Sequence, residues 1–149
     1  MANFKELKTE NITTVVAMMK DFYEIDDYPF DAELTRKNFE QFIEKEDFGK
    51  CFLIYNDNNE VSGYIIIIYF FSFEFGGKSA ILDELYLNDK ARGKGLGKKA
   101  VDFIQQYAKE QALKMMYLEV ELHNERAINL YLDKGFKMHH RNLMIYLNE

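Results

Sequence analysis

The stretch from Leu82 to Gly97, LDELYLNDKARGKGLG, constrains the fold of this chain more than any other feature. Its first half, residues 82–88, has the apolar content of a strand, and its glycines lead into a helical pattern. A glycine-rich loop between a strand and a helix N-terminus gathers unpaired backbone N–H groups at the positive end of the helix dipole. Positively charged side chains surround the loop at Lys90, Arg92, Lys94, Lys98 and Lys99. The loop therefore predicts a phosphate-binding site, and the structural alternative is a tight strand–helix turn beneath a solvated basic patch.

Length and composition predict a single domain over residues 1–149. A hydrophobic content of 48%, with 15% aromatic residues, is enough for a substantial core. The net charge of −6 argues against nucleic acid as a partner. The most apolar run, YIIIIYFF at residues 64–71, is too short to span a membrane and predicts a buried strand. Cys51 is the only cysteine and no secretory leader is visible, so we expect a cytoplasmic protein.

Hydrophobic periodicity predicts helices and strands along the whole chain. Apolar residues at helical spacing, with Asp31 and Asn124 as capping residues, predict helices over residues 11–24, 32–46, 96–112 and 125–134. Alternating or continuous apolar runs predict strands over residues 3–8, 51–55, 60–73, 79–88, 115–122, 136–140 and 143–147. The order β-α-α-β-β-β-α-β-α-β-β indicates an α/β fold with a mixed sheet.

A second pattern lies on the helix predicted after Asn124, where Ala127 or Ile128 and Tyr131 share its stripe. With the glycine loop it makes two motifs, Arg92-x-x-Gly95-x-Gly97 and Asn124-x-x-Ala127-x-x-x-Tyr131-x-x-x-Gly135-Phe136. In these motifs, their separation and the order of elements, the chain resembles the GCN5-related N-acetyltransferase (GNAT) superfamily over nearly its whole length. Residues 69–97 also show a looser resemblance to spermidine/spermine-type amine acetyltransferases. The family resemblance implies a mixed, mostly antiparallel sheet with two splayed central parallel strands, flanked by about four helices.

The resemblance also implies where acetyl-coenzyme A (acetyl-CoA) binds. Family members hold it in an opening between two splayed parallel strands, which here are residues 82–88 and 115–122. Backbone groups that would pair with the pantetheine arm like an added strand belong to Leu85, Tyr86 and Leu87. Amides that would hold the pyrophosphate belong to Arg92, Gly93, Lys94, Gly95, Leu96, Gly97 and Lys98. The far side of the arm would meet Asn124 and Ala127.

The implied reaction is direct acetyl transfer to an amine through a ternary complex. A primary amine, with a pKa of roughly 10, must lose a proton before it attacks the thioester. Glu84 and Glu119 are equal candidates for the base, and Asp83 ranks slightly behind them. Asp83 and Glu84 point to opposite faces of a regular strand, so both reach the cleft only if a bulge intervenes. Tyr131 is expected near the thioester sulfur, as proton donor to the departing thiolate.

The acceptor is expected between the splayed strands and the first two helices. Tyr23 and Glu24 resemble a substrate-contacting pair of the polyamine enzymes, and together with Glu84 they are the expected acceptor-binding residues. Carboxylates cluster nearby at Asp21, Glu24, Asp26, Asp27, Asp31 and Glu33. An acidic mouth would steer a cationic acceptor such as a small amine, a polyamine or a peptide amine, although a solvated acidic loop has the same composition. Exposed strand edges near the C-terminus leave a homodimer open.

Other functions fit the sequence less well. A non-catalytic acyl-CoA sensor or interaction module on the same fold is the alternative, and retention of Tyr131 with candidate bases argues against it. A nucleotide-binding enzyme is disfavoured because the loop has neither the Walker nor the Rossmann glycine pattern. No metal is expected: His139 and His140 would face opposite sides of a strand, and His123 has no second ligand at a useful spacing. Cys51 is expected to be a small buried hydrophobe.

Overall fold

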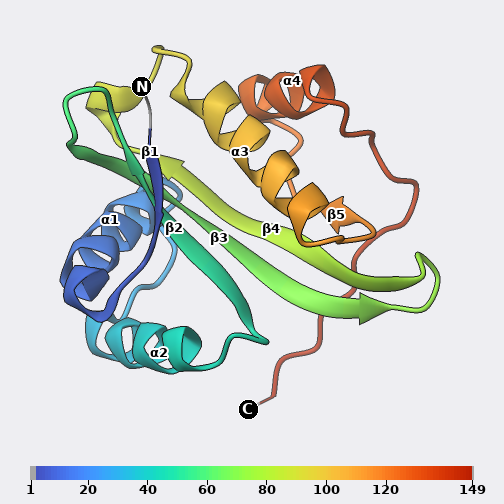
Figure 1. The fold of residues 1–149 in the computed structure, drawn as a ribbon, viewed down its shortest axis with the longest axis horizontal. Helices are drawn as coiled ribbons and strands as arrows, with labels where there is room; N and C mark the ends of the chain where they lie inside the picture. Colours follow the sequence, from blue (N-terminus) through green and yellow to red (C-terminus); the bar gives the residue numbers. More distant parts are fainter. Residues whose placement is uncertain (1–2, 149) are drawn as a thin grey trace.

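The structure is a computed structural model that describes residues 3–148 (Figure 1). Its five-stranded sheet has the order β1-β2-β3-β4-β5. Neighbours are antiparallel from β1 to β4, and β5 runs parallel to β4. The strands are β1 (Asn3–Glu6), β2 (Gly49–Tyr55), β3 (Val61–Ser72), β4 (Gly77–Leu87) and β5 (Met116–Tyr117). The predicted α/β class, with a mixed and mostly antiparallel sheet, is confirmed.

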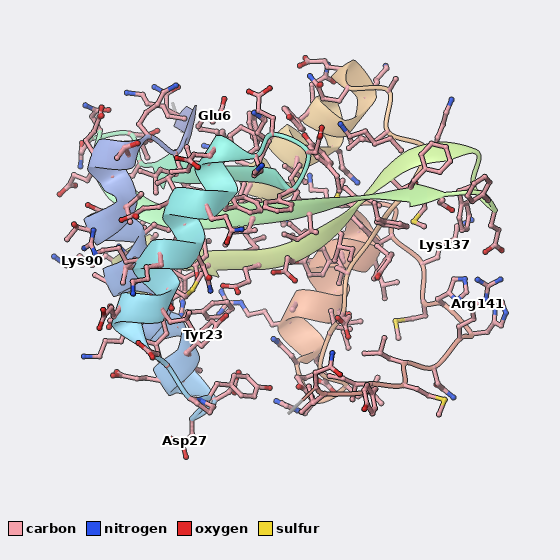
Figure 2. The ribbon with its side chains drawn as sticks, turned by 90° about the horizontal axis from the view of Figure 1, so that it is seen from below. Glu6, Tyr23, Asp27, Lys90, Lys137 and Arg141 are labelled. Atoms are coloured by element: carbon pink, nitrogen blue, oxygen red, sulfur yellow. The ribbon has the colours of Figure 1, made fainter. Side chains whose placement is uncertain are left out.

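The α-helices cover both faces of this sheet, with α1 and α2 on one face and α3 and α4 on the other (Figures 1 and 2). The predicted caps are confirmed: Leu34 N–H donates to Asp31 Oδ1 at 3.1 Å, and Ala127 N–H donates to Asn124 Oδ1 at 3.2 Å. The predicted helices all form and differ only at their ends. Their bounds, with two short 3₁₀ helices, are η1 (Thr9–Asn11), α1 (Ile12–Ile25), α2 (Ala32–Glu44), η2 (Asp89–Ala91), α3 (Leu96–Glu110) and α4 (Glu125–Asp133).

Side chains of β2 and β3 alternate between two hydrophobic clusters, as the twofold period of a strand requires. One cluster lies under α1 and α2 and includes Val15, Met19, Phe39, Cys51, Leu53, Tyr64, Ile66 and Tyr86. The other lies under α3 and includes Phe52, Ile54, Ile65, Ile67, Leu82, Leu96, Ala100 and Ile104. Cys51 is 3% exposed, which confirms it as a small buried hydrophobe.

A β-bulge interrupts β4 in its middle. Leu82 is paired with Ile67 on β3 and Glu84 with Ile66, so Asp83 is an extra residue in β4. The extra residue shifts the alternation of side chains: Leu82 belongs to the cluster under α3, whereas Tyr86 belongs to the cluster under α1 and α2. Asp83 and Glu84 therefore both lie on the α1–α2 face, which is the case that the sequence left conditional on a bulge.

The parallel pair β4–β5 is short and lies at the edge of the sheet. Of the strand predicted for residues 115–122 only Met116–Tyr117 forms, and it is paired with Ala80 and Ile81. Beyond Ile81, β4 has no strand beside it on this side among the described residues. A strand is stabilised by hydrogen bonds to a neighbouring strand. Residues 118–122 have no such bonds to β4, so they do not continue β5.

The strands predicted for residues 136–140 and 143–147 are wrong: after α4 the described chain, to residue 148, forms no strand. The segment is an irregular tail that passes near the β3–β4 turn, where Arg141 donates to both carboxylate oxygens of Glu74 at 2.8 and 2.7 Å (Figure 2). His139 and His140 stack their rings 4.6 Å apart, so the prediction that they face opposite sides is also wrong. The apolar alternation is present, but the tail pairs with no strand among residues 3–148.

Candidate active site

The glycine loop lies between the end of β4 and α3, as the sequence predicts. Gly93 and Gly95 adopt φ values of 77° and 78°, in the left-handed region that favours glycine, and Gly95 is the N-cap of α3. The helical hydrogen bonds begin with Lys99 N–H, which donates to Gly95 O at 3.2 Å. Within the described chain, the N–H groups of residues 92–98 donate no hydrogen bond. They form a group of unpaired donors at the positive end of a helix dipole.

One side of the loop backbone is open. A Cβ added to Gly93 or Gly95 would meet no atom within 4 Å, so this side of the backbone is open to a ligand. The side chain of Arg92 folds back on the loop: Nε donates to Leu87 O at 3.1 Å, and Nη1 lies 3.1 Å from Asp89 Oδ1. This chain therefore fits the pyrophosphate of a coenzyme at its loop.

The backbone of β4 opens toward the missing part of β5. Asn88 N–H donates to Ser62 O on β3 at 2.9 Å. Alternate residues of an antiparallel strand form backbone hydrogen bonds to the same neighbour. The backbone N–H and C=O of Tyr86 therefore also point to β3, whereas those of Leu85 and Leu87 point to the open side of β4. Leu87 O accepts from Arg92, which leaves Leu85 with both groups available to an extended ligand.

Tyr131 lies on α4, beside the same open region. It packs at the border of the cluster under α3, to which Leu85 and Leu87 also pack, and its ring is 5.5 Å from that of Phe136. Burial raises the pKa of Tyr131 to about 12, so its phenol stays protonated at neutral pH. Its hydroxyl has no hydrogen-bond partner in the described part of the chain. The hydroxyl is therefore available as a donor to a bound group.

A cavity of about 660 Å³ lies between α1, α2 and the sheet. The two carboxylates of the β4 bulge, Asp83 and Glu84, form part of its wall. Its other lining residues are mostly apolar and comprise Met19, Tyr23, Pro29, Phe30, Asp31, Leu34, Thr35, Asn38, Phe39, Phe42, Ile66 and Ile68. Figure 2 shows Tyr23 and its helix on this face of the sheet. The bulge therefore brings two carboxylates to the cavity on one face of the sheet. The same strand, β4, has an unpaired backbone edge next to them.

The two carboxylates of the bulge differ in their surroundings. Glu84 is half-buried, and each of its oxygens accepts one phenol: Tyr64 Oη donates to Oε1 at 2.7 Å and Tyr23 Oη to Oε2 at 2.8 Å. Burial raises the pKa of Glu84, and these two hydrogen bonds oppose that rise. Asp83 accepts no hydrogen bond from the described residues; burial and the charge of Glu119 raise its pKa. Asp83 is thus the carboxylate of the bulge that has no hydrogen-bond donor among the described residues, and the pKa of both groups is raised.

The remaining predicted residues lie around the cavity to different extents. Glu119 is exposed on the segment after β5, near enough for its charge to act on Asp83. Tyr23 lines the cavity, but Glu24 is exposed and is not part of the lining. Of the predicted acidic cluster on and after α1, only Asp31 lines the cavity, and its carboxylate is engaged as the cap of α2. The lining therefore has three carboxylates, those of Asp31, Asp83 and Glu84, and most of the predicted acidic cluster lies outside it.

Tyr64 is the residue of this site that the sequence analysis missed. It lies in the apolar run of β3, is 0% exposed, and donates to Glu84 Oε1, whereas Tyr23 donates to Oε2. The run predicts a buried strand correctly. The hydroxyl group of Tyr64 was the signal that this strand also carries a hydrogen bond of the site. A buried tyrosine hydroxyl normally finds a hydrogen-bond partner, so a tyrosine at the start of such a run indicates a buried acceptor nearby.

Comparison with known proteins gives the class to which this site belongs. The model of the acetyltransferase (GNAT) family matches residues 15–136, and the chain belongs to this family. It is similar to the "Uncharacterized N-acetyltransferase YhfO" of Bacillus subtilis (strain 168), with 26% identity over 137 residues, 91% of this chain and 89% of the relative. The protein is accordingly an acetyltransferase that uses acetyl-CoA.

Solved structures share the fold. A structure described as a "possible acetyltransferase" from Clostridium difficile 630 superimposes with a TM-score of 0.88 at 18% identity, covering 100% of this chain and 99% of that one. A "predicted acetyltransferase with acetyl-CoA" from Clostridium acetobutylicum superimposes with a TM-score of 0.79 at 15% identity, covering 98% and 96%. Among the described residues, no helix is long and apolar enough to cross a membrane.

Proposed function

We propose that residues 1–149 form a single domain that transfers the acetyl group of acetyl-CoA directly to an amine, within a ternary complex. The observation that carries this proposal is the bulge in β4. It turns Asp83 and Glu84 toward the cavity, while the following residue, Leu85, presents its backbone to the open side of the sheet. One strand thereby supplies contacts for both reactants, and their proximity accounts for much of the rate.

Several parts of the chain would hold the coenzyme. Leu85 and Leu87 lie along the open side of β4, and the intervening Tyr86 keeps this part of the strand bonded to β3. The loop amides from Arg92 to Lys98 are unpaired and suit its pyrophosphate. Asn124, the N-cap of α4, and Ala127 in its first turn would contact the far side of the pantetheine arm. Only Oδ1 of Asn124 is used in the capping bond, so its side-chain nitrogen can donate to a ligand. When bound, acetyl-CoA supplies an acetyl group already activated as a thioester.

We assign the general base to Asp83, with Glu119 as the charge that raises its basicity. A carboxylate with a raised pKa accepts a proton more readily, and Asp83 has no competing donor among the described residues. Glu84 is instead a positioning residue, because Tyr23 and Tyr64 occupy both of its oxygens. This assignment puts Asp83 ahead of Glu84 and Glu119, whereas the sequence ranked those two equally and Asp83 slightly behind them.

Tyr131 is the proposed acid. Its phenol is protonated at neutral pH, and its hydroxyl donates no hydrogen bond within the described chain. A donor placed in a half-buried site gives a stronger hydrogen bond to a developing thiolate than a water molecule in bulk solvent would.

Thiol release from acetyl-CoA across a panel of amines tests the proposal. We expect amine-dependent release and an acetylated amine as the product, with saturation by both reactants in a sequential pattern. Tight binding of acetyl-CoA without release for any amine would instead indicate the non-catalytic sensor. Parallel double-reciprocal plots would contradict the ternary complex.

A further inference from the structure

The carboxylates of the cavity between α1, α2 and the sheet come from two elements. Asp83 and Glu84 belong to β4, and Asp31 is the N-cap of α2. Among the described residues that line the cavity there is no Lys, Arg or His. A bound molecule therefore meets negative charge from both the sheet and the helix, and no cationic side chain of the lining balances it.

The basic side chains of α2 interact elsewhere. Arg36 Nη2 donates to Thr13 Oγ1 on α1 at 2.9 Å, and Lys37 Nζ lies 3.5 Å from Glu33 Oε1. Positions 36 and 37 are off the face of α2 that lines the cavity, whose residues recur at a spacing of three or four: Leu34, Thr35, Asn38, Phe39 and Phe42. An anionic group in the cavity would therefore pair with neither of these cations.

A polar stripe on α2 faces the cavity. Asp31, Thr35 and Asn38 follow one another at intervals of four and three residues, and all three line the cavity. Asp31 Oδ1 accepts the Leu34 N–H at 3.1 Å, but Oδ2 accepts no hydrogen bond from the described residues. This stripe therefore offers a bound molecule a charged acceptor with one oxygen free.

Aromatic and aliphatic side chains make most of the remaining wall. Tyr23 and Phe30, for example, meet edge to face with ring centroids 5.6 Å apart. The cavity volume of about 660 Å³ is in the range of small-molecule sites. A carboxylate that entered such a site would lose water contacts and face three like charges, and both effects raise its free energy.

We propose that the cavity admits as acceptor an amine that carries no acidic group, and that Asp31 is the specificity-determining residue that rejects acids at the α2 side. This inference rests on the proposed acetyl transfer to an amine and narrows the class of acceptor. It excludes free amino acids, whose carboxylate would lie beside the β4 carboxylates, and amines with a carboxylate at the far end. A hydroxyl or a second ammonium group at the far end can instead donate to Asp31 Oδ2.

Pairs of acceptors that differ by a carboxylate test this inference. We compare 6-aminohexan-1-ol with 6-aminohexanoate, tyramine with tyrosine, and any other accepted amine with its carboxylate-bearing counterpart, using kcat/KM for thiol release. We expect the member without the carboxylate to be favoured at least tenfold in each pair. Equal values, or a preference for the acid, would overturn the inference. If no amine releases thiol, the proposed function itself fails, which is a separate outcome.

Asp31→Asn tests the specificity-determining residue. Asparagine caps a helix about as well as aspartate, so this variant removes the charge and keeps the start of α2. We expect the preference for 6-aminohexan-1-ol over 6-aminohexanoate to fall at least threefold, and the preference for tyramine over tyrosine to stay unchanged. Low ionic strength is used, because Asp31 is exposed and salt screens its charge.

Asp27→Asn is the matched control. Asp27 is exposed in the turn after α1, points away from the fold (Figure 2) and is not part of the lining. Its φ of 56° is one that asparagine also adopts, so both variants make the same change of charge without backbone strain. Asp27→Asn should keep the wild-type preference in both pairs. Equal preferences in the two variants, or a loss in both pairs for Asp31→Asn, would overturn the role of Asp31.

Discussion

The surroundings of Asp83 follow from its position in the backbone. As the extra residue of a bulge it lies on the same face as Glu84, and it shares the cavity without sharing the two phenols that hold its neighbour. Burial and Glu119 then raise its pKa. Two adjacent carboxylates therefore have different hydrogen-bond partners, and this difference is the basis of the different roles that we propose for them.

Replacement of Asp83 by asparagine separates activity from stability. We expect kcat to fall by about 10²–10⁴, the range for loss of a general base, with little change in the dissociation constant of acetyl-CoA. The folded chain binds the Asp83 proton more tightly than the unfolded chain, so this carboxyl contributes stability below its ordinary pKa and loses it as pH rises through the raised value. Asp83→Asn should therefore melt higher than the wild type at pH 7, and this advantage should vanish near pH 3. Unchanged turnover would remove Asp83 as the base.

Tyr131→Phe is expected to lower kcat by about 10²-fold or more while the affinity for acetyl-CoA stays near the wild-type value. The hydroxyl has no partner in the described chain, so its removal breaks no protein hydrogen bond and the melting temperature should hold. Stopped-flow turnover, coenzyme titration and thermal melting give the three quantities. If turnover is equal in the two proteins, Tyr131 is not the acid.

At the scale of elements, the site is made where three of them end or deform. The bulge of β4 sets the carboxylates, the glycine loop begins α3, and the loss of β5 after Tyr117 opens the side of β4 that faces α4. Each feature leaves backbone or side-chain groups unpaired within the described chain, and unpaired groups are what a ligand can use.

The glycine loop can be tested with a matched pair of substitutions. Gly95 and Gly76 have φ values of 78° and 90°, and an added Cβ would meet no atom within 4 Å at either. Alanine at each therefore carries the same left-handed strain, about 1–2 kcal/mol of unfolding free energy, without a clash inside the protein. Gly95→Ala should also raise the dissociation constant of acetyl-CoA tenfold or more, because its methyl group would lie on the open side of the loop, where we propose that the pyrophosphate binds. Gly76→Ala, in the β3–β4 turn, should bind normally; equal binding by both would contradict the loop assignment.

At the scale of the whole molecule, coenzyme binding should act on the fold itself. Acetyl-CoA would contact β4, the glycine loop and α4. Since β5 pairs with β4 at only two positions, the coenzyme would add contacts where the sheet itself has few. At a concentration about 100 times its dissociation constant, it should raise the free energy of unfolding by about 2.7 kcal/mol and the melting temperature by roughly 5–10 °C. Scanning fluorimetry measures this shift. ATP and NAD should give none, and a shift with them but not with coenzyme A would favour a nucleotide-binding protein.

The sequence predicted much of this site. The glycines at 93 and 95, the caps Asp31 and Asn124, and the helices with their apolar stripes depend on local geometry and short-range hydrogen bonds, which neighbouring residues specify. The prediction of strands at 136–140 and 143–147 was wrong. Apolar alternation indicates which side chains share a face of a strand, but it does not show that a neighbouring strand is available to pair with it. The site roles of the predicted residues stay predictions.

The sequence by itself determined the family, the class of fold and the loop with its unpaired amides, since all of these are written in spacing along the chain. Only the tertiary structure decided that Asp83 and Glu84 share a face, that Tyr64 holds Glu84, and that the acidic residues around α1 leave the cavity largely apolar. The physical reason is that a bulge, a buried hydrogen bond and a missing strand partner each depend on residues far away in the sequence. Their energies exist only once those residues meet.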